Sequence, residues 1–317
     1  MFSKCSALVL LVFVLEGGSS RANAQQKGQY LPGQFGLNAG ILPDPGLTYA
    51  NITINYSSTT LNGPNGESVP VTGTYDIWAV ENMFLYVPNI KVLGGHMMFG
   101  IIAPTFANGS VTVPQFGSAG GYGIADILVQ PVTLGWKLKR ADVWVADGFV
   151  APTGRYTPGA DNNIGSGYWG NQVMSGSTVY LTKNRGTSAN LFTDWEIHGQ
   201  KEGSNVTPGQ TFTMEWGLGQ VLPLDKQFRK LLQLGLIGYD QWEVTKDSGT
   251  LSNGMPASLN PAYSAHAIGF QTSFILPRKG LNFYFKFEPE YSATSRVQGR
   301  TLALGGSYTF RIPKLEP

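Results

Sequence analysis

Residues 281–291 read LNFYFKFEPEY, and this stretch decides the fold. The odd positions carry Leu, Phe, Pro and Tyr, whereas the even positions carry Asn, Tyr, Lys and Glu. Because successive side chains of a strand point to opposite faces, the stretch predicts a β-strand with one apolar and one mostly polar face. In a membrane barrel the apolar face would contact lipid. In a soluble β-sandwich or propeller the same face would pack on a core, so periodicity alone leaves both open.

The same alternation returns in residues 190–198, 211–218 and 231–243. In a barrel the polar positions of all four stretches would line the lumen. The candidate lumen-lining residues are therefore Asp194, Glu196, Glu215, Tyr239, Gln241, Glu243, Tyr284, Lys286, Glu288 and Glu290.

Twelve strand-like stretches follow one another from residue 47 to residue 310. They lie near 47–61, 74–88, 93–106, 122–137, 140–151, 170–182, 186–201, 208–222, 228–246, 261–276, 280–295 and 299–310. Short and long links alternate between them, and only the last link, near 296–298, is short where a long one is due. Outer-membrane barrels have short periplasmic turns and longer extracellular loops. The sequence therefore predicts an all-β fold, a transmembrane antiparallel barrel of about 12 strands.

The N-terminus has the features of a secretory signal. Lys4 precedes an apolar run over residues 7–15, and Ala22-Asn23-Ala24 is a cleavage site, so the mature chain should begin at Gln25. The apolar run is too short to span a bilayer as a helix. Cys5, the one cysteine, leaves with this segment, which excludes disulfides, thiol catalysis and cysteine metal sites in the mature chain.

The chain thus divides into four parts. We expect a signal peptide over 1–24, a periplasmic N-terminal segment over 25–46, the barrel over 47–310 and a C-terminal tail over 311–317. Residues 25–46 are rich in Gly, Gln and Pro and could enter the lumen as a plug or remain a loose tail.

Composition narrows the function classes. Charged residues make up 13% of the chain, against about 25% in globular proteins, and there are 41 glycines. The formal net charge of +2 gives no basic excess to suggest nucleic acid. His96, His198 and His266 are far apart and show no metal-ligand spacing. Barrel lipases place Ser two residues after His, where this chain has Met98, Gln200 and Ile268. We therefore expect no enzyme, no metal and no cofactor.

Several motifs resemble one known family. They are YLPGQFGLNAG at 30–40, ADILVQP at 125–131, LGWK at 134–137, APTGRY at 151–156, NIGSGYW at 163–169, GQTF at 209–212 and GYDQ at 238–241. Their order is similar to that in outer-membrane transporters of the meta-pathway of phenol degradation. The last strand, which ends in Tyr308 and Phe310, resembles the signal that the outer-membrane assembly machinery reads. The resemblance implies passage of small hydrophobic or aromatic compounds and no defined catalytic residues.

The loop over residues 152–169 gives a second set of candidates. Turn-forming sequences flank polar residues and an aromatic pair, and the candidates are Arg155, Asp161, Asn163, Tyr168 and Trp169. The loop could fold toward the lumen as a constriction, or it could be a surface loop anchored by its aromatic residues.

The resulting hypothesis is a passive, porin-like channel in the outer membrane of a Gram-negative bacterium. Its partners would be membrane lipid, a small hydrophobic or aromatic solute and the assembly machinery. A structural or adhesive barrel without transport is the alternative, and a barrel enzyme is a weaker one.

Overall fold

The computed structural model describes residues 28–70, 73–113 and 117–311. The expected signal peptide and residues 312–317 of the expected tail lie outside the described residues. Within them, twelve strands form an antiparallel barrel, as the sequence predicts. These strands are β1 (Gly46–Leu61), β2 (Thr74–Val87), β4 (Gly95–Val113), β6 (Ile127–Lys137), β7 (Ala141–Ala151), β8 (Gly170–Tyr180), β9 (Thr187–His198), β11 (Thr211–Pro223), β12 (Leu231–Glu243), β14 (Ser264–Leu276), β15 (Leu281–Thr294) and β16 (Val297–Arg311).

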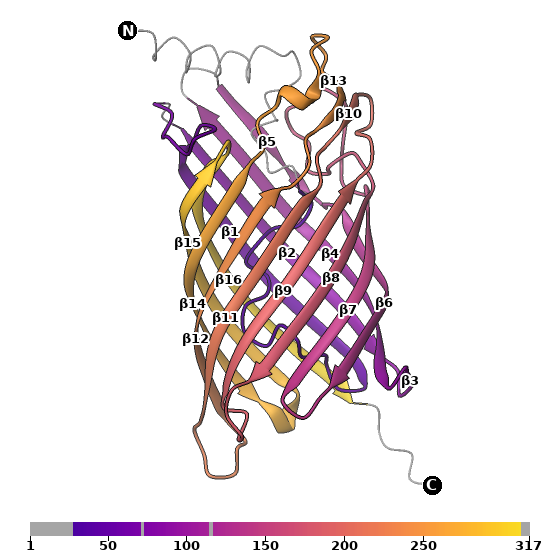
Figure 1. Ribbon diagram of the computed structural model, residues 1–317, viewed down its shortest axis with the longest axis vertical. Helices are drawn as coiled ribbons and strands as arrows, with labels where there is room; N and C mark the ends of the chain where they lie inside the picture. Colours follow the sequence, from indigo (N-terminus) through magenta and orange to yellow (C-terminus); the bar gives the residue numbers. More distant parts are fainter. Residues whose placement is uncertain (1–27, 71–72, 114–116, 312–317) are drawn as a thin grey trace.

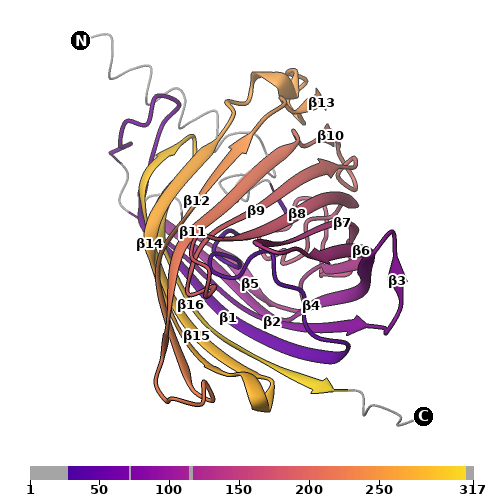
Figure 2. The same ribbon diagram turned by 60° about the horizontal axis from the view of Figure 1, so that its bottom comes forward.

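The barrel closes through β1, which pairs with β2 on one side and with β16 on the other (Figures 1 and 2). Strand β2 in turn pairs with β4, so the ring of hydrogen bonds has no free edge along its main body. A closed ring satisfies every backbone N–H and C=O between strands, which is the condition for crossing a bilayer with strands. The fold is a closed antiparallel β-barrel that meets this condition.

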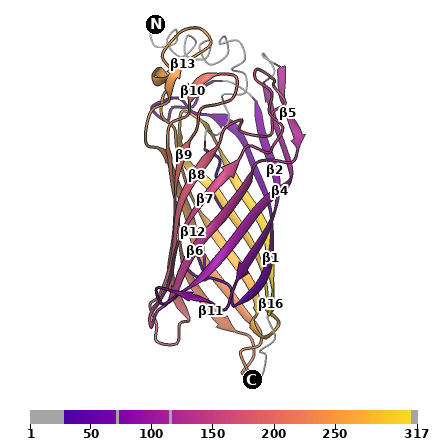
Figure 3. The ribbon, with the colours of Figure 1, turned by 90° about the vertical axis from the view of Figure 1, so that its right-hand side faces the viewer.

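The two ends of the barrel differ in the length of their links. At the short-turn end lie β3 (Lys91–Val92) and the 3₁₀ turn η3 (Pro277–Lys279). At the long-loop end lie β5 (Gly117–Gly123), β10 (Asn205–Thr207), β13 (Ser248–Thr250) and the turn η2 (Ala257–Leu259). Strands β10 and β13 pair with each other above the barrel rim (Figure 3). No helix among the described residues is long and apolar enough to span a membrane.

Alternation along each strand separates an inner from an outer face. In β9 the even residues from Ser188 to His198 are all buried, whereas Trp195 and Ile197 between them are exposed. In β15 Lys286 and Glu288 are buried and Phe283 is 51% exposed. The apolar side chains therefore form the outer surface, because that surface meets hydrocarbon instead of water.

This assignment predicts a position-dependent cost of charge. Leu234 lies on the outer face of β12 and Leu259 lies in the exposed turn η2 of the long-loop end. Leu234→Arg should destabilise the folded barrel by about 2–4 kcal/mol if the site lies near the bilayer midplane. The matched variant Leu259→Arg should assemble normally. The measurement is the fraction of each protein that shows heat-modifiable gel mobility after folding into vesicles. Equal folded fractions would contradict the membrane-facing assignment of Leu234.

Candidate functional site

The interior of the barrel holds the chain's own N-terminal segment, residues 28–45, which appears as an indigo coil in Figure 1. The segment rises from β1, which begins at the short-turn end, to Gly28 beside Tyr263 near the long loops. For residues 25–46 the sequence left open a plug in the lumen or a loose periplasmic tail; the described part of that segment lies within the lumen. Its backbone lacks regular structure, so its polar groups need partners from the wall.

The wall supplies these partners mainly from β9, β11 and β15. The carboxylate of Glu196 accepts hydrogen bonds from the backbone N–H groups of Gln29 (2.6 Å) and Tyr30 (3.0 Å). Farther along, Asn38 donates its side-chain amide to Gln233 (2.7 Å), and its backbone N–H to Asn190 (3.0 Å). These lumen side chains thus act as the hydrogen-bonding partners that a strand would otherwise provide.

Residues 33–35 are held between two opposite charges. Glu215 accepts hydrogen bonds from the backbone N–H groups of Gly33 (2.8 Å) and Phe35 (2.7 Å), and from the Tyr30 hydroxyl (2.6 Å). The ammonium of Lys286 donates to the carbonyls of Gly33 (3.0 Å) and Phe35. Gly33 has a φ of 99°, a left-handed conformation that favours glycine. Both wall side chains are almost fully buried, so these charge-assisted contacts are shielded from water.

The other side of the segment is apolar. Phe35 stacks on Phe192 of β9, with ring centroids 3.9 Å apart, and both rings contact Trp144 of β7. Trp144 also donates its indole N–H to the Ala39 carbonyl (2.7 Å). Met98 and Met174 belong to the same cluster. The segment therefore separates a polar half of the lumen, on β9 to β15, from an apolar half on β2 to β8.

A cavity of about 1360 Å³ lies along the apolar half and continues to the long loops. Its wall includes Ala79, Met83 and Leu85 of β2, Met98 and Ile102 of β4, and Leu128 of β6. Near the long loops it is bounded by residues such as Tyr156, Lys201 and Leu251. Burial lowers the pKa of Lys201, whose ammonium lies 5.4 Å from the centre of the Tyr156 ring. The arrangement can accept a small apolar molecule between the segment and the wall.

A family model described as "Putative MetA-pathway of phenol degradation" matches residues 58–305 of this sequence. The chain belongs to this phenol-degradation family. The family resemblance that the sequence motifs indicate is thereby confirmed. The match begins inside β1, so residues 28–57, including the segment in the lumen, lie outside it.

Solved structures share the fold. A COG4313 outer membrane channel from Pseudomonas putida F1 superimposes with a TM-score of 0.68 at 13% identity, covering 89% of this chain and 100% of that chain. The β domain of the Bordetella autotransporter BrkA gives a TM-score of 0.52 at 12% identity, covering 84% of this chain and 100% of that chain. Neither of these structures is named as an enzyme. No curated protein matches the sequence.

All ten candidate lumen residues of this family member lie on the inner face of the barrel, but they contact different groups. Glu196, Glu215 and Lys286 hold the segment, and Gln241 lies 3.4 Å from the Tyr30 carbonyl. Tyr239 and Glu290 belong to a separate network described below. The remaining members of the set are Asp194, Glu243, Tyr284 and Glu288, of which only Tyr284 lines the cavity.

The five loop candidates do not form one cluster. Tyr168 is 6% exposed and packs edge-on against His198, whereas Trp169 is 58% exposed and contacts Phe149 on the outside. Arg155 donates to the Asn162 carbonyl (2.6 Å). Two further contacts brace the loop: the Asp161 carbonyl accepts from Gly120, and the Asn163 side chain bonds the Thr157 backbone. Asn163 also lines the cavity.

Sequence reasoning gave no role to Asp126, which joins the two ends of that loop. Its carboxylate accepts hydrogen bonds from Gly154 N–H (2.9 Å), Ser166 N–H (2.7 Å) and the Ser166 hydroxyl (2.6 Å).

The three histidines lie apart: His198 contacts Glu196 at 3.5 Å, and His266 contacts Asp240 at 2.7 Å. Among the described residues, no group of three His, Cys, Asp or Glu side chains could hold a metal ion.

The apolar wall of the cavity was also not predicted from the sequence. In residues 74–87 the inner positions Ile77, Met83 and Leu85 are as apolar as the outer positions Trp78 and Phe84. A strand that is apolar on both faces shows no alternation, so a search for alternation overlooks it. The signal available in the sequence was the contrast between this strand and the alternating strands of the second half.

Proposed function

We propose that this protein is a passive outer-membrane channel for small hydrophobic or aromatic compounds. The observation that carries the proposal is the cavity between the lumen segment and the apolar wall of β2 to β8. A water-filled pore for sugars would present polar side chains there, whereas Met83, Leu85 and Met98 are exposed to the cavity. Membership of the phenol-degradation family and the fold of the Pseudomonas putida channel support the same function.

A passive mechanism fits the chemistry of the interior. Apolar contacts along the cavity favour a solute that leaves water by about 25 cal/mol for each Å² of apolar surface it buries. No single contact of that kind is strong enough to trap the solute, and weak binding at several places permits exit. Side chains of the polar half of the lumen are engaged in hydrogen bonds to the segment.

The test is uptake of labelled toluene and of a labelled sugar by cells with and without the protein. Toluene uptake should fall severalfold in cells without it, while sugar uptake stays the same. Equal loss of both solutes would indicate a general pore. If neither changes, the structural or adhesive barrel becomes the better hypothesis.

Substitutions at two neighbouring residues of β2 test whether the solute passes through this cavity. Ala79 of β2 is buried and lines the cavity, whereas Val80 belongs to the outward-facing phase of the same strand. Ala79→Trp should fill part of the cavity and reduce toluene uptake severalfold, and Val80→Trp should leave it unchanged because an outer aromatic residue contacts lipid. Folded protein is quantified in both strains by gel mobility before and after boiling. Unreduced uptake by folded Ala79→Trp protein would contradict this path.

A further inference from the structure

An acidic side chain of β2 lines the cavity beside its apolar wall. Glu81 lies midway along β2, is 6% exposed and forms part of the cavity wall. Along the same inner face its neighbours are Ala79 and Met83. The residues opposite it in the two adjacent strands are Ile52 of β1 and Pro104 of β4. The side chains beside it on β1, β2 and β4 are thus apolar.

The pairing of β2 with β4 is irregular at this position. The register changes between Val80, which pairs with Phe106, and Glu81, which pairs with Pro104, so Thr105 is an extra residue. Such bulges redirect side chains and recur next to functional sites. Proline at position 104 has no backbone N–H to donate.

Glu81 combines an unpartnered carboxylate oxygen with a place in the cavity wall, whereas Glu288, which also has an unpartnered oxygen, does not line the cavity. Glu196 and Glu215 accept hydrogen bonds from the lumen segment, and Glu290 accepts them from two tyrosines. The Oε2 atom of Glu81 is buried and has no hydrogen-bond partner within the described part of the chain. A buried acceptor without a partner is unfavourable, and a ligand in the cavity that donates a hydrogen bond to it would remove that cost.

We propose that Glu81 is a specificity-determining residue that accepts a hydrogen bond from the hydroxyl group of an aromatic solute in the cavity. The apolar ring of such a solute would contact Met83 and the neighbouring wall, and its hydroxyl would replace the missing donor. A site built to bind a hydroxyl discriminates against the analogue that lacks it, because that analogue leaves the acceptor unpaired. The inference rests on the proposed channel function and names the substrate class within it.

Phenol and toluene form the test pair, since they differ mainly in a hydroxyl against a methyl group. Initial uptake of each labelled compound is measured in cells carrying the full-length protein, E81L, E81Q or the matched control E202Q. Glu202 is an exposed carboxylate of the long-loop end. The ratio of phenol to toluene uptake should fall about tenfold in E81L, the loss expected when a hydrogen bond to a buried acceptor is removed. E81Q keeps an acceptor oxygen and should lose about threefold, whereas E202Q should keep the original ratio.

The possible outcomes separate this inference from the channel function itself. If uptake of neither compound depends on the unmodified protein, the channel function fails. If uptake depends on the protein but the ratio in folded E81L stays within about twofold of the original, the role of Glu81 is overturned. Gel mobility before and after boiling measures folded protein in each strain. If E81L fails to fold, the near-isosteric variant E81Q is used in its place. An unchanged ratio of phenol to toluene uptake in E81Q overturns the proposal, and a reduced ratio supports it.

Discussion

Replacing Glu215 with Ala is expected to free the segment inside the barrel and to raise the ion conductance of the protein severalfold in planar bilayers. This one carboxylate accepts hydrogen bonds from Tyr30, Gly33, Gln34 and Phe35. Each buried donor that loses its partner costs about 1–3 kcal/mol, and the loss falls on a short irregular segment with no internal hydrogen-bond ladder to hold it. A segment released from β11 would leave lumen space that water and ions can enter.

Three further variants serve as references for this conductance measurement. Glu215→Gln retains one acceptor oxygen and should raise conductance less than Glu215→Ala. Glu202→Ala removes an exposed carboxylate from the long-loop end and should leave conductance unchanged. Deletion of residues 28–42 removes the segment and sets the upper limit. If the deletion raises conductance and Glu215→Ala does not, Glu215 is not what holds the segment. If the deletion itself has no effect, the segment does not limit passage.

The sequence predicted the outer surface well because lipid and lumen impose opposite demands on neighbouring residues. In β9 and β15 most inner positions carry charged or amide side chains, so residues such as Trp195 and Glu196 alternate, and Phe192 is an apolar exception on the inner face of β9. The ends of those strands were also predictable, since Gly, Pro and charged residues mark the turns between them. Twelve strands and their alternating links followed from these two signals.

The interior was harder to predict for a physical reason. The segment containing Gly33 and Phe35 has no periodicity, and its partners, such as Lys286, lie about 250 residues away. Glu196 and Glu215 appeared in the sequence as generic lumen charges, whereas they bind backbone N–H groups of this segment. Glu81 escaped notice because it stands in a strand whose inner and outer faces are both apolar. The alternation of residues along a strand predicts which face a side chain occupies. It does not predict which distant segment of the chain that side chain contacts.

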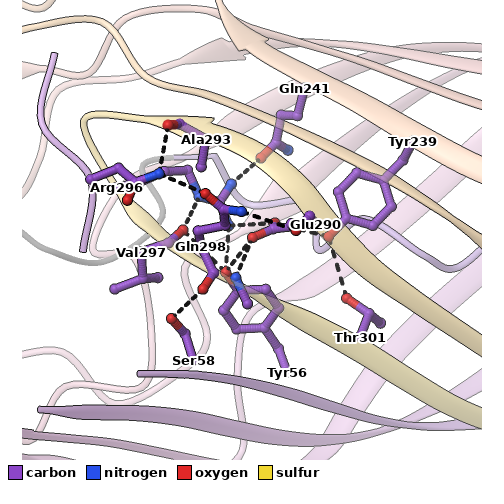
Figure 4. Close-up of polar contacts among 12 residues, drawn as sticks. Tyr56, Ser58, Tyr239, Gln241, Glu290, Ala293, Arg296, Val297, Gln298 and Thr301 are labelled. Atoms are coloured by element: carbon purple, nitrogen blue, oxygen red, sulfur yellow. Dashed lines mark hydrogen bonds and ion pairs between the residues drawn. The ribbon is translucent and has the colours of Figure 1, made fainter. Parts of the chain in front are cut away.

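Replacing Arg296 with Met is expected to lower the free energy of unfolding by about 3–5 kcal/mol, as for other buried ion pairs that lose one partner. Figure 4 shows the network around this residue at the long-loop end of β15 and β16. Glu290 accepts hydrogen bonds from the hydroxyls of Tyr56 (2.8 Å) and Tyr239 (2.9 Å) and lies 3.5 Å from the Arg296 guanidinium. Arg296 also donates to Gln241 (3.1 Å), so the network joins β1, β12, β15 and β16.

The control uses the same substitution in an exposed ion pair. Arg229 contacts Asp225 at 2.8 Å in the turn between β11 and β12 at the short-turn end, where water screens both charges. Arg229→Met should therefore change stability little. Unfolding by guanidinium chloride in detergent micelles, followed by tryptophan fluorescence, compares the two variants with the unmodified protein. A loss in Arg296→Met no larger than in Arg229→Met would contradict a stabilising role for the network.

A double-mutant cycle then tests whether Arg296 acts through Glu290. Glu290→Gln removes the charge that Arg296 neutralises and keeps one acceptor oxygen, enough for one of the two tyrosine hydroxyls of Tyr56 and Tyr239. If the two charges depend on each other, the double variant should lose less than the sum of the single variants, by about 0.5–3 kcal/mol. This follows because each single variant leaves one buried charge without its partner, whereas the double variant leaves none. Strictly additive losses would mean that Arg296 stabilises the barrel through Gln241 and the tyrosine rings instead of through the carboxylate.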